Sequence, residues 1–173
     1  TEKHFGRSCT LAPYPLRFTP NVTDVTHKEK ALKDLHYDKT KKTLLILGGS
    51  QGSTFLNVQL CNTLSVAPPN TFQVIHQTGH DHIKELEEFY KQLNIPAQVF
   101  AYKQDLTPYY QAADIVVCRA GAGTLFETAF FKKQCITIPL EIASTSHQVD
   151  NAYAMQETHP QLFKVMRQKE LEN

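Results

Sequence analysis

Residues 44–53 of the chain read Leu-Leu-Ile-Leu-Gly-Gly-Ser-Gln-Gly-Ser. An apolar run typical of a buried strand leads into three glycines and small polar residues, and a helical pattern follows. Glycines let the backbone turn sharply and approach a ligand closely. The helix that follows adds unpaired N–H groups and the positive end of its dipole. The stretch therefore predicts a strand–turn–helix unit that can bind a phosphate group.

A second turn of the same kind follows a later apolar strand. Residues 115–119 read Ile-Val-Val-Cys-Arg and lead into Ala-Gly-Ala-Gly-Thr at 120–124, again before a helical pattern. Two such turns in one parallel sheet favour a diphosphate ligand, such as a nucleotide sugar.

Short apolar strands alternate with helical stretches along the rest of the chain. We expect strands at residues 43–47, 72–78, 98–101, 115–118, 136–139 and 162–166, and helices at 28–35, 54–64, 82–93, 106–113, 124–131 and 148–156. This alternation predicts an α/β fold, a Rossmann-like parallel sheet with helices on both faces. Ligands of such sheets bind beyond the carboxyl ends of the strands, so the candidate residues are those directly after each strand.

The composition is that of an ordinary globular domain. The chain has 173 residues, of which 41% are hydrophobic and 20% are charged, and its net charge is +1. Nothing in this balance favours nucleic-acid binding, and no apolar run approaches the ~20 residues of a membrane span. The cysteines lack CxxC spacing, which favours reduced thiols in a cytosolic protein; they are Cys9, Cys61, Cys118 and Cys135.

The first 26 residues differ from the rest of the chain. They lack periodicity and contain Pro13, Pro15 and Pro20, so we expect an extended interdomain connection, followed by one domain over residues 27–173. The chain begins with Thr1, which suggests part of a longer protein. Arg17 in this segment could pair with a diphosphate, although a lone loop arginine is more commonly a solvated charge.

The first glycine turn offers Gly49, Ser50 and Gln51 as candidate ligand contacts. It is neither a Walker P-loop, because no Gly-Lys-Ser/Thr follows, nor the dinucleotide pattern G-x-G-x-x-G. The alternative interpretation is a tight strand-to-helix turn without a ligand.

The second glycine turn offers Gly123 and Thr124, with Glu127 one helical turn later. The Thr124 N–H and hydroxyl groups can both donate to a phosphate oxygen. A carboxylate at position 127 can accept two hydrogen bonds from a ribose diol. Alternatively, Glu127 only complements the positive end of the helix dipole.

Polar residues also follow two other strands. His147, Gln148 and Asn151 cluster at the start of a helix, where amides suit a hydroxyl-rich sugar. Helix capping by the neighbouring serines is the simpler explanation. Tyr102 and Lys103 follow the third strand, where a flat base could lie against the ring and the main chain.

We predict neither a metal site nor a cofactor. His76, His80, Asp81 and His82 lie close in sequence, but their spacing matches no zinc pattern. The sequence contains no Asp-x-Asp motif. It indicates neither a catalytic triad nor a pair of carboxylates that could serve as acid and base.

Taken together, these motifs resemble the MurG family of bacterial glycosyltransferases. The family shares their order and intervals: Gly-Gly-Ser-Gln-Gly-Ser at 48–53, Arg-Ala-Gly-Ala-Gly-Thr at 119–124 with Glu127, His147-Gln148 with Asn151-Ala152, and Pro-Leu-Arg at 15–17, which resembles the family's Asn-Pro-Val/Ile-Arg. The resemblance covers about residues 15–166. It implies the C-terminal half of a GT-B enzyme that transfers N-acetylglucosamine (GlcNAc) from UDP-GlcNAc to lipid I, giving lipid II in peptidoglycan synthesis.

The resemblance also implies roles for individual residues. Ser50 and Gln51 match glycine-loop positions that contact the donor, and Thr124 matches the position at the diphosphate. Glu127 matches the acid that holds the ribose hydroxyls. Arg17 matches the family arginine near the diphosphate.

Further matches concern the base and the sugar. Tyr102 and Lys103 match the segment whose main chain pairs with uracil. Gln148 and Asn151 match residues that contact the sugar hydroxyls, with His147 beside them. Sugar contacts from residues 141–146 stay open, because this loop has no close match and position 146 is Ser where many members have Asp.

The family's N-terminal domain is absent from this chain, as is its closing helix. The resemblance therefore implies that the general base, the lipid I site and the membrane contact belong to the missing half. It places the whole enzyme peripherally, at the cytoplasmic side of the bacterial inner membrane.

Three other interpretations remain open at this point. One is the donor domain of another GT-B enzyme, such as the eukaryotic subunit that adds the second GlcNAc to a dolichol lipid. Another is a non-catalytic nucleotide-sugar module related to an epimerase. The third is a flavodoxin-like regulatory domain, which would bind no UDP-sugar.

Overall fold

The computed structural model describes residues 14–16, 18, 25–68, 70–142 and 146–172. Within this part of the chain, six strands form one sheet: β1 (Lys42–Leu47), β2 (Phe72–Gln77), β3 (Ala97–Phe100), β4 (Ile115–Cys118), β5 (Gln134–Thr137) and β6 (Phe163–Val165). All neighbouring strands are parallel, and their order is β3-β2-β1-β4-β5-β6. This is the strand order of doubly wound dinucleotide-binding folds, so the predicted Rossmann-like α/β fold is confirmed.

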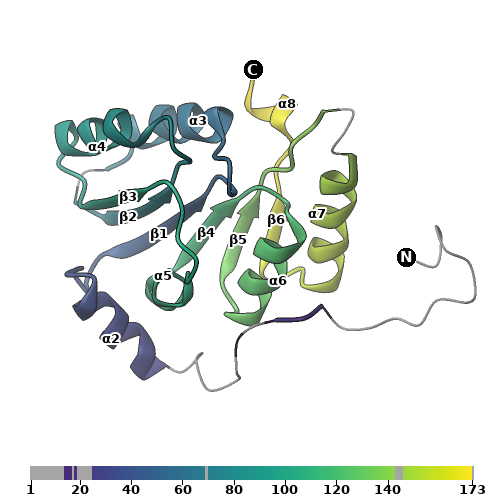
Figure 1. The fold of residues 1–173 in the computed structure, drawn as a ribbon, viewed down its shortest axis with the longest axis horizontal. Helices are drawn as coiled ribbons and strands as arrows, with labels where there is room; N and C mark the ends of the chain where they lie inside the picture. Colours follow the sequence, from purple (N-terminus) through teal and green to yellow (C-terminus); the bar gives the residue numbers. More distant parts are fainter. Residues whose placement is uncertain (1–13, 17, 19–24, 69, 143–145, 173) are drawn as a thin grey trace, which may run out of the picture.

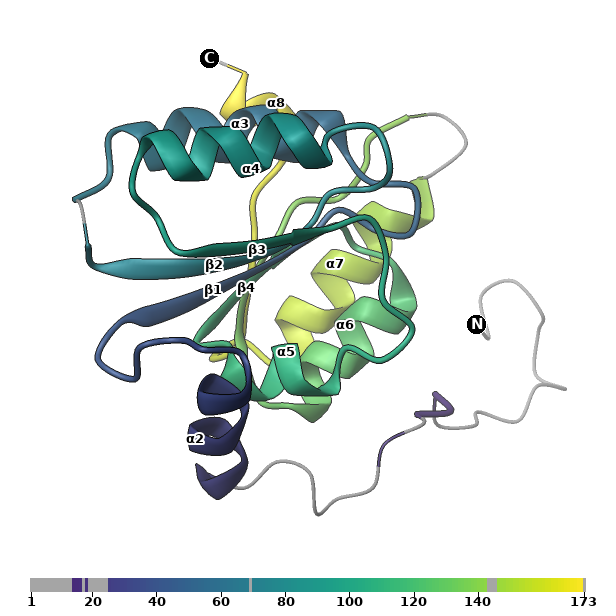
Figure 2. The ribbon, with the colours of Figure 1, turned by 60° about the vertical axis from the view of Figure 1, so that its left-hand side comes forward.

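Helices cover both faces of this sheet. They are α2 (Val25–Asp34), α3 (Thr54–Ser65), α4 (Ile83–Gln92), α5 (Thr107–Ala112), α6 (Ala122–Phe130), α7 (Ser146–Thr158) and α8 (Gln168–Leu171). Figures 1 and 2 show α3 and α4 on one face, and α2, α5, α6 and α7 on the other.

Two apolar cores result, one on each face of the sheet. Leu45 and Leu47 of β1 pack with α2, α5, α6 and α7. Ile46 points the opposite way, into the core beneath α3 and α4. Leu45 and Ile46 are both fully buried, which explains why the strand reads as an unbroken apolar run instead of an alternating one.

Several elements differ from the sequence predictions; helix α2, for example, begins three residues earlier than expected. Helix α6 begins at Ala122, not at residue 124, because Gly121 takes an extended conformation and serves as the N-cap. Strand β5 spans Gln134–Thr137, two residues earlier than expected. The short helix α8 was not predicted; a capping box between Arg167 and Glu170 closes its start.

Part of the predicted interdomain connection packs against α6. The Tyr14 ring stacks on Phe126 with centroids 4.6 Å apart, and the Phe18 ring lies 5.5 Å from Phe130. Arg17, like Cys9, lies outside the described residues. The division into residues 1–26 and 27–173 therefore stays a prediction, and α2 itself begins at Val25.

The described cysteines are free. Cys118 and Cys135 are buried on neighbouring strands with their sulfur atoms 3.6 Å apart, and Cys61 is half-buried. Within the described ranges, no helix is both long and apolar enough to cross a membrane.

Candidate functional site

A cleft of about 700 Å³ opens at the carboxyl ends of β1 and β4. The strand order reverses between these two strands, and this is where doubly wound folds bind ligands. The volume is in the range of sites that hold nucleotide-sized molecules. The lining consists of residues 47–55, Gln77, Tyr102, Lys103, Leu106, Arg119, Gly121, Gly123, Thr124, Glu127, Leu140, Gln148 and Gln168.

The turn after β1 is held by the end of β2. Gly49 and Gly52 have φ angles of +88° and +79°, which favour glycine. A Cβ on Gly52 would lie 2.1 Å from the Thr78 carbonyl oxygen, so the two backbones touch. The Gln77 Nε2 donates to the Gly49 carbonyl at 2.8 Å. These contacts fix the turn at the floor of the cleft.

Helix α3 starts directly after this turn. Ser53 is its N-cap and accepts a hydrogen bond from the Leu56 N–H at 3.3 Å. The N–H groups of a helix's first residues have no carbonyl partner within the helix; here these residues are Thr54 and Phe55, both on the cleft wall. Ser50 and Gln51 lie exposed at the tip of the turn.

Helix α6 presents a second N-terminus to the same cleft. Its first hydrogen bond runs from the Leu125 N–H to the Gly121 carbonyl at 3.1 Å. Gly123 and Thr124 therefore lie in the first turn, where N–H groups lack helical partners. Glu127 follows on the same helix, half-buried, and also lines the cleft. The two helix ends together favour a ligand with adjacent negative charges.

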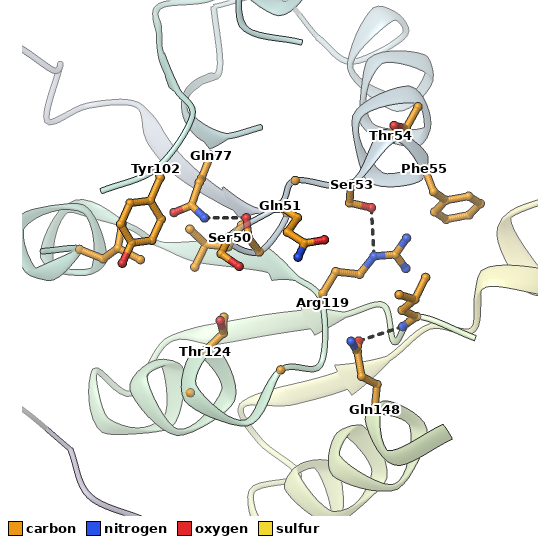
Figure 3. A pocket seen from close by; sticks show the side chains of 18 of the residues that line it. Ser50, Gln51, Ser53, Thr54, Phe55, Gln77, Tyr102, Arg119, Thr124 and Gln148 are labelled. Carbon is orange, nitrogen blue, oxygen red and sulfur yellow. Dashed lines mark hydrogen bonds between the residues drawn. The ribbon is translucent and has the colours of Figure 1, made fainter. Parts of the chain in front are cut away.

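Arg119 joins the two turns and was not among the predicted contact residues. Its side chain is 8% exposed. The Nε donates to the Ser53 Oγ at 3.0 Å (Figure 3). The Nη1 donates to the Gln168 Oε1 at 2.9 Å. Nη1 also lies 3.2 Å from the Ile138 carbonyl oxygen.

The charge of Arg119 has electrostatic consequences for the cleft. Burial lowers the pKa of its guanidinium from the usual 12.5, yet the group remains a cation at neutral pH. Among the described residues it forms no ion pair with a carboxylate. An anion in the cleft would offset this positive charge.

The other predicted residues are divided between the cleft and its surroundings. Tyr102 and Lys103 lie exposed at the rim. Gln148 lines the cleft, and its Oε1 accepts from the Leu140 N–H at 3.0 Å. Figure 3 shows Thr124 and Gln148 across from Ser50 and Gln51.

Two predicted residues lie away from the lining. His147 is exposed and does not contribute to the cleft wall. The Asn151 Nδ2 donates to the Ala120 carbonyl at 3.3 Å, so this side chain ties α7 to the second turn.

Sequence reasoning could have found some of the missed residues. Gln77 is the last residue of β2 and Arg119 directly follows β4, so the rule that ligands bind at the carboxyl ends of strands selects both residues. Gln168 reaches the cleft from α8, which had no signal in the sequence.

Two of the histidines considered as metal ligands, His76 and His82, have other partners. His76 is fully buried, with Nδ1 2.9 Å from the Tyr90 hydroxyl and Nε2 3.2 Å from the Asn57 Oδ1. Burial lowers the pKa of His76 to about 3. His82 contacts Thr54 instead, at 3.2 Å. Across the described residues, no group of three His, Cys, Asp or Glu side chains could hold a metal ion.

The amino-acid sequence matches one family profile over most of its length. The glycosyltransferase family 28 C-terminal domain covers residues 43–172. Similar curated proteins carry the name UDP-N-acetylglucosamine--N-acetylmuramyl-(pentapeptide) pyrophosphoryl-undecaprenol N-acetylglucosamine transferase. The one from Nitrosomonas eutropha is 38% identical over 120 residues, which are 69% of this chain and 34% of the relative.

A second curated protein and two solved structures are also similar to this chain. The protein of the same name from Dichelobacter nodosus is 35% identical over 147 residues, 83% of this chain and 40% of its own. The chain thus spans two fifths or less of the length of these relatives. The crystal structure of Acinetobacter baumannii MurG superposes with a TM-score of 0.65 at 28% identity, covering 80% of this chain and 40% of MurG. The glycotransferase of kitacinnamycin shares the fold, with a TM-score of 0.56 at 20% identity, over 75% of this chain and 31% of its own.

Proposed function

The chain belongs to the glycosyltransferase family 28 C-terminal domain family, and we propose that it is the domain that binds UDP-GlcNAc in an inverting glycosyltransferase. The whole enzyme would transfer GlcNAc to lipid I and form lipid II. The names of the curated relatives support this donor and acceptor. The acceptor site, the general base and the membrane contact, at the cytoplasmic face of the inner membrane, would belong to a second domain.

One observation carries the proposal: two helix N-termini and a buried guanidinium meet at one cleft. The first turns of α3 and α6 direct unpaired N–H groups at the same space, and Arg119 lies between them without a carboxylate partner among the described residues. A pyrophosphate has two adjacent anionic groups, so it matches two N-termini better than a single phosphate does.

The remaining lining groups suit the other parts of the donor. Glu127, beyond the α6 N-terminus, would accept hydrogen bonds from the ribose diol. Tyr102 and Lys103 at the rim would lie against the uracil ring. Gln148 would contact the sugar, and Ser50 and Gln51 at the tip of the glycine turn would also contact the donor. Arg17 would lie near the diphosphate, and Asn151, with His147 beside it, would contact the sugar hydroxyls.

The same groups would assist the transfer step. When the acceptor hydroxyl attacks the anomeric carbon, the bond to UDP breaks and negative charge develops on the leaving diphosphate. The α3 and α6 N-termini and Arg119 would stabilise that charge. The chain alone should therefore bind UDP without turning over UDP-GlcNAc.

Calorimetric titration of the chain with UDP tests the proposal. A Glu127→Gln variant removes the charge but keeps the shape, and we expect it to weaken UDP binding by about 1.5–3 kcal/mol, roughly 10- to 150-fold. Glu157→Gln, an exposed change elsewhere in the chain, is the matched control and should bind like the unmodified chain. Absence of heat at millimolar UDP, or equal affinities of the two variants, would contradict the assignment.

A further inference from the structure

The acceptors that hold the Arg119 guanidinium are uncharged groups. Its Nε donates to the Ser53 hydroxyl at 3.0 Å, and its Nη1 donates to the Gln168 amide oxygen at 2.9 Å. Nη1 also lies 3.2 Å from the Ile138 carbonyl oxygen and 3.3 Å from that of Pro139. A hydroxyl, an amide and two carbonyls satisfy the N–H groups of a cation without neutralising its charge. The cleft therefore keeps a fixed positive charge.

Gln168 brings α8 into contact with this cation. It is the first residue of α8 and lines the cleft, and its bond to Arg119 joins residues 49 positions apart in the chain. The Phe55 ring, also on the cleft wall, has its centroid 5.3 Å from the Arg119 Cζ. Among the described residues, the hydrogen bonds of this guanidinium come from Nε and Nη1, which leaves the N–H groups of Nη2 for a ligand.

An ion pair fastens α8 beside the cleft. The Arg167 Nε donates to the Glu141 Oε1 at 2.7 Å, and its Nη2 donates to the other carboxylate oxygen. The Gln168 backbone N–H donates to the same Oε1 at 3.0 Å. Glu141 therefore holds the backbone of Gln168 in place. Because both of its oxygens are bonded to Arg167, this carboxylate does not pair with Arg119.

We propose that Gln168 is a positioning residue for Arg119: it fixes the guanidinium in the cleft through a neutral acceptor, so that the positive charge remains available to the diphosphate of the donor. The inference rests on the proposed function, because it assumes that Arg119 acts on that diphosphate. The Gln168 amide oxygen is bonded to Arg119, so its effect on the ligand passes through the guanidinium. A carboxylate at position 168 would hold the guanidinium more strongly but would cancel its charge.

The test compares the affinities of UDP and of uridine, which lacks the diphosphate. The ratio of the two, measured by calorimetric titration, gives the contribution of the diphosphate. Gln168→Met keeps the length of the side chain but removes the amide, and we expect it to lower the ratio about three- to tenfold. Gln168→Glu supplies a charged acceptor, and we expect it to lower the ratio about tenfold or more, because the carboxylate neutralises the guanidinium and repels the diphosphate. The affinity for uridine should stay the same in both variants.

The unfolding temperature distinguishes this role from a structural one. A carboxylate accepts from a guanidinium more strongly than an amide does, so Gln168→Glu should unfold at the same temperature as the unmodified chain or higher. A residue that only stabilised the fold would then leave the ratio of affinities unchanged in this variant.

Gln161→Glu is the matched control. Gln161 is exposed and precedes β6, whereas Gln168 follows the end of that strand, so the same charge is added away from the cleft. This variant should retain the ratio of the unmodified chain.

The possible failures can be told apart. If the unmodified chain binds uridine as tightly as UDP, the diphosphate site of the proposed function fails, and this inference fails with it. If the unmodified chain favours UDP and both Gln168 variants do so to the same degree, the positioning role alone is overturned. A ratio that falls only together with the unfolding temperature, in both variants, also overturns it, since it shows a purely structural role.

Discussion

Replacement of Gly52 tests whether backbone contact with the end of β2, and not a side chain of the glycine turn, sets the position of the turn. A Cβ at this position would lie 2.1 Å from the Thr78 carbonyl oxygen and 2.9 Å from the Gly79 Cα. Both atoms belong to the backbone, so no side chain can rotate away to make room. In addition, the φ of +79° is a conformation that alanine rarely adopts.

The size of the effect follows from these two causes. The left-handed conformation costs about 1–2 kcal/mol for a residue with a Cβ, and overpacking against a fixed backbone costs about 1–3 kcal/mol more. We therefore expect Gly52→Ala to lower the free energy of unfolding by about 2–5 kcal/mol. The turn would also move away from β2, so UDP binding should weaken more than tenfold, a change of about 1.4 kcal/mol.

Two other glycines of the cleft provide a graded comparison. Gly49 has a φ of +88°, but no described atom lies within 4 Å of its added Cβ, so Gly49→Ala should cost only the conformational part, about 1–2 kcal/mol. Gly121 has an ordinary φ of −68° and equally open space. Gly121→Ala should therefore cost less than about 1 kcal/mol, through the weaker N-cap.

Urea unfolding followed by circular dichroism measures the three free energies, and calorimetry measures UDP binding by each variant. We expect the order Gly121, Gly49, Gly52 from least to most destabilised. A Gly52→Ala variant that is as stable as Gly121→Ala and binds UDP normally would refute the argument that backbone contact with Thr78 sets the position of the turn.

Two further predictions concern buried basic side chains. The pKa of His76 is about 3 in the folded chain and near 6.5 when unfolded, so stability is fully present above pH 6.5 and decreases as the pH falls toward 3; at pH 5 the loss should be about 2 kcal/mol. Urea unfolding at pH 7 and pH 5 measures it, and a His76→Gln variant with the same pH dependence would assign the loss to other groups. Arg119→Lys keeps the charge but cannot reproduce the hydrogen bonds to Ser53, Ile138 and Gln168. We expect it to lower the free energy of unfolding by about 1–3 kcal/mol and to weaken UDP binding; unchanged values in both measurements would show that charge alone matters.

The strands, the glycine turns and the sheet class could be predicted from the sequence because they depend on local properties. An apolar run such as residues 44–47 indicates a strand that is buried on both faces of a sheet, whichever strands lie beside it. Gly49 and Gly52 indicate a turn, whichever segments pack against it. The rule that ligands bind after parallel strands then selected Ser50, Gln51, Thr124 and Glu127, which all line the cleft.

Other features required the tertiary structure, because they depend on which elements become neighbours. Nothing local in the sequence indicates that β1 lies beside β4, yet this pairing brings the two glycine turns to one cleft. The direction of a side chain on a helix depends on where the helix starts and what it packs against. The Asn151 side chain, for example, donates to the Ala120 carbonyl on a distant segment, a contact that no local pattern indicates.

The sequence by itself thus determined the kind of structure and the chemistry available at the strand ends. Only the tertiary structure decided how these groups combine: the Arg119 side chain forms hydrogen bonds with three segments that are distant in the chain. The physical reason is the separation along the chain over which each interaction acts. Backbone conformation and hydrophobic periodicity act over a few neighbouring residues, whereas hydrogen bonds and buried charges join residues that are distant in the chain.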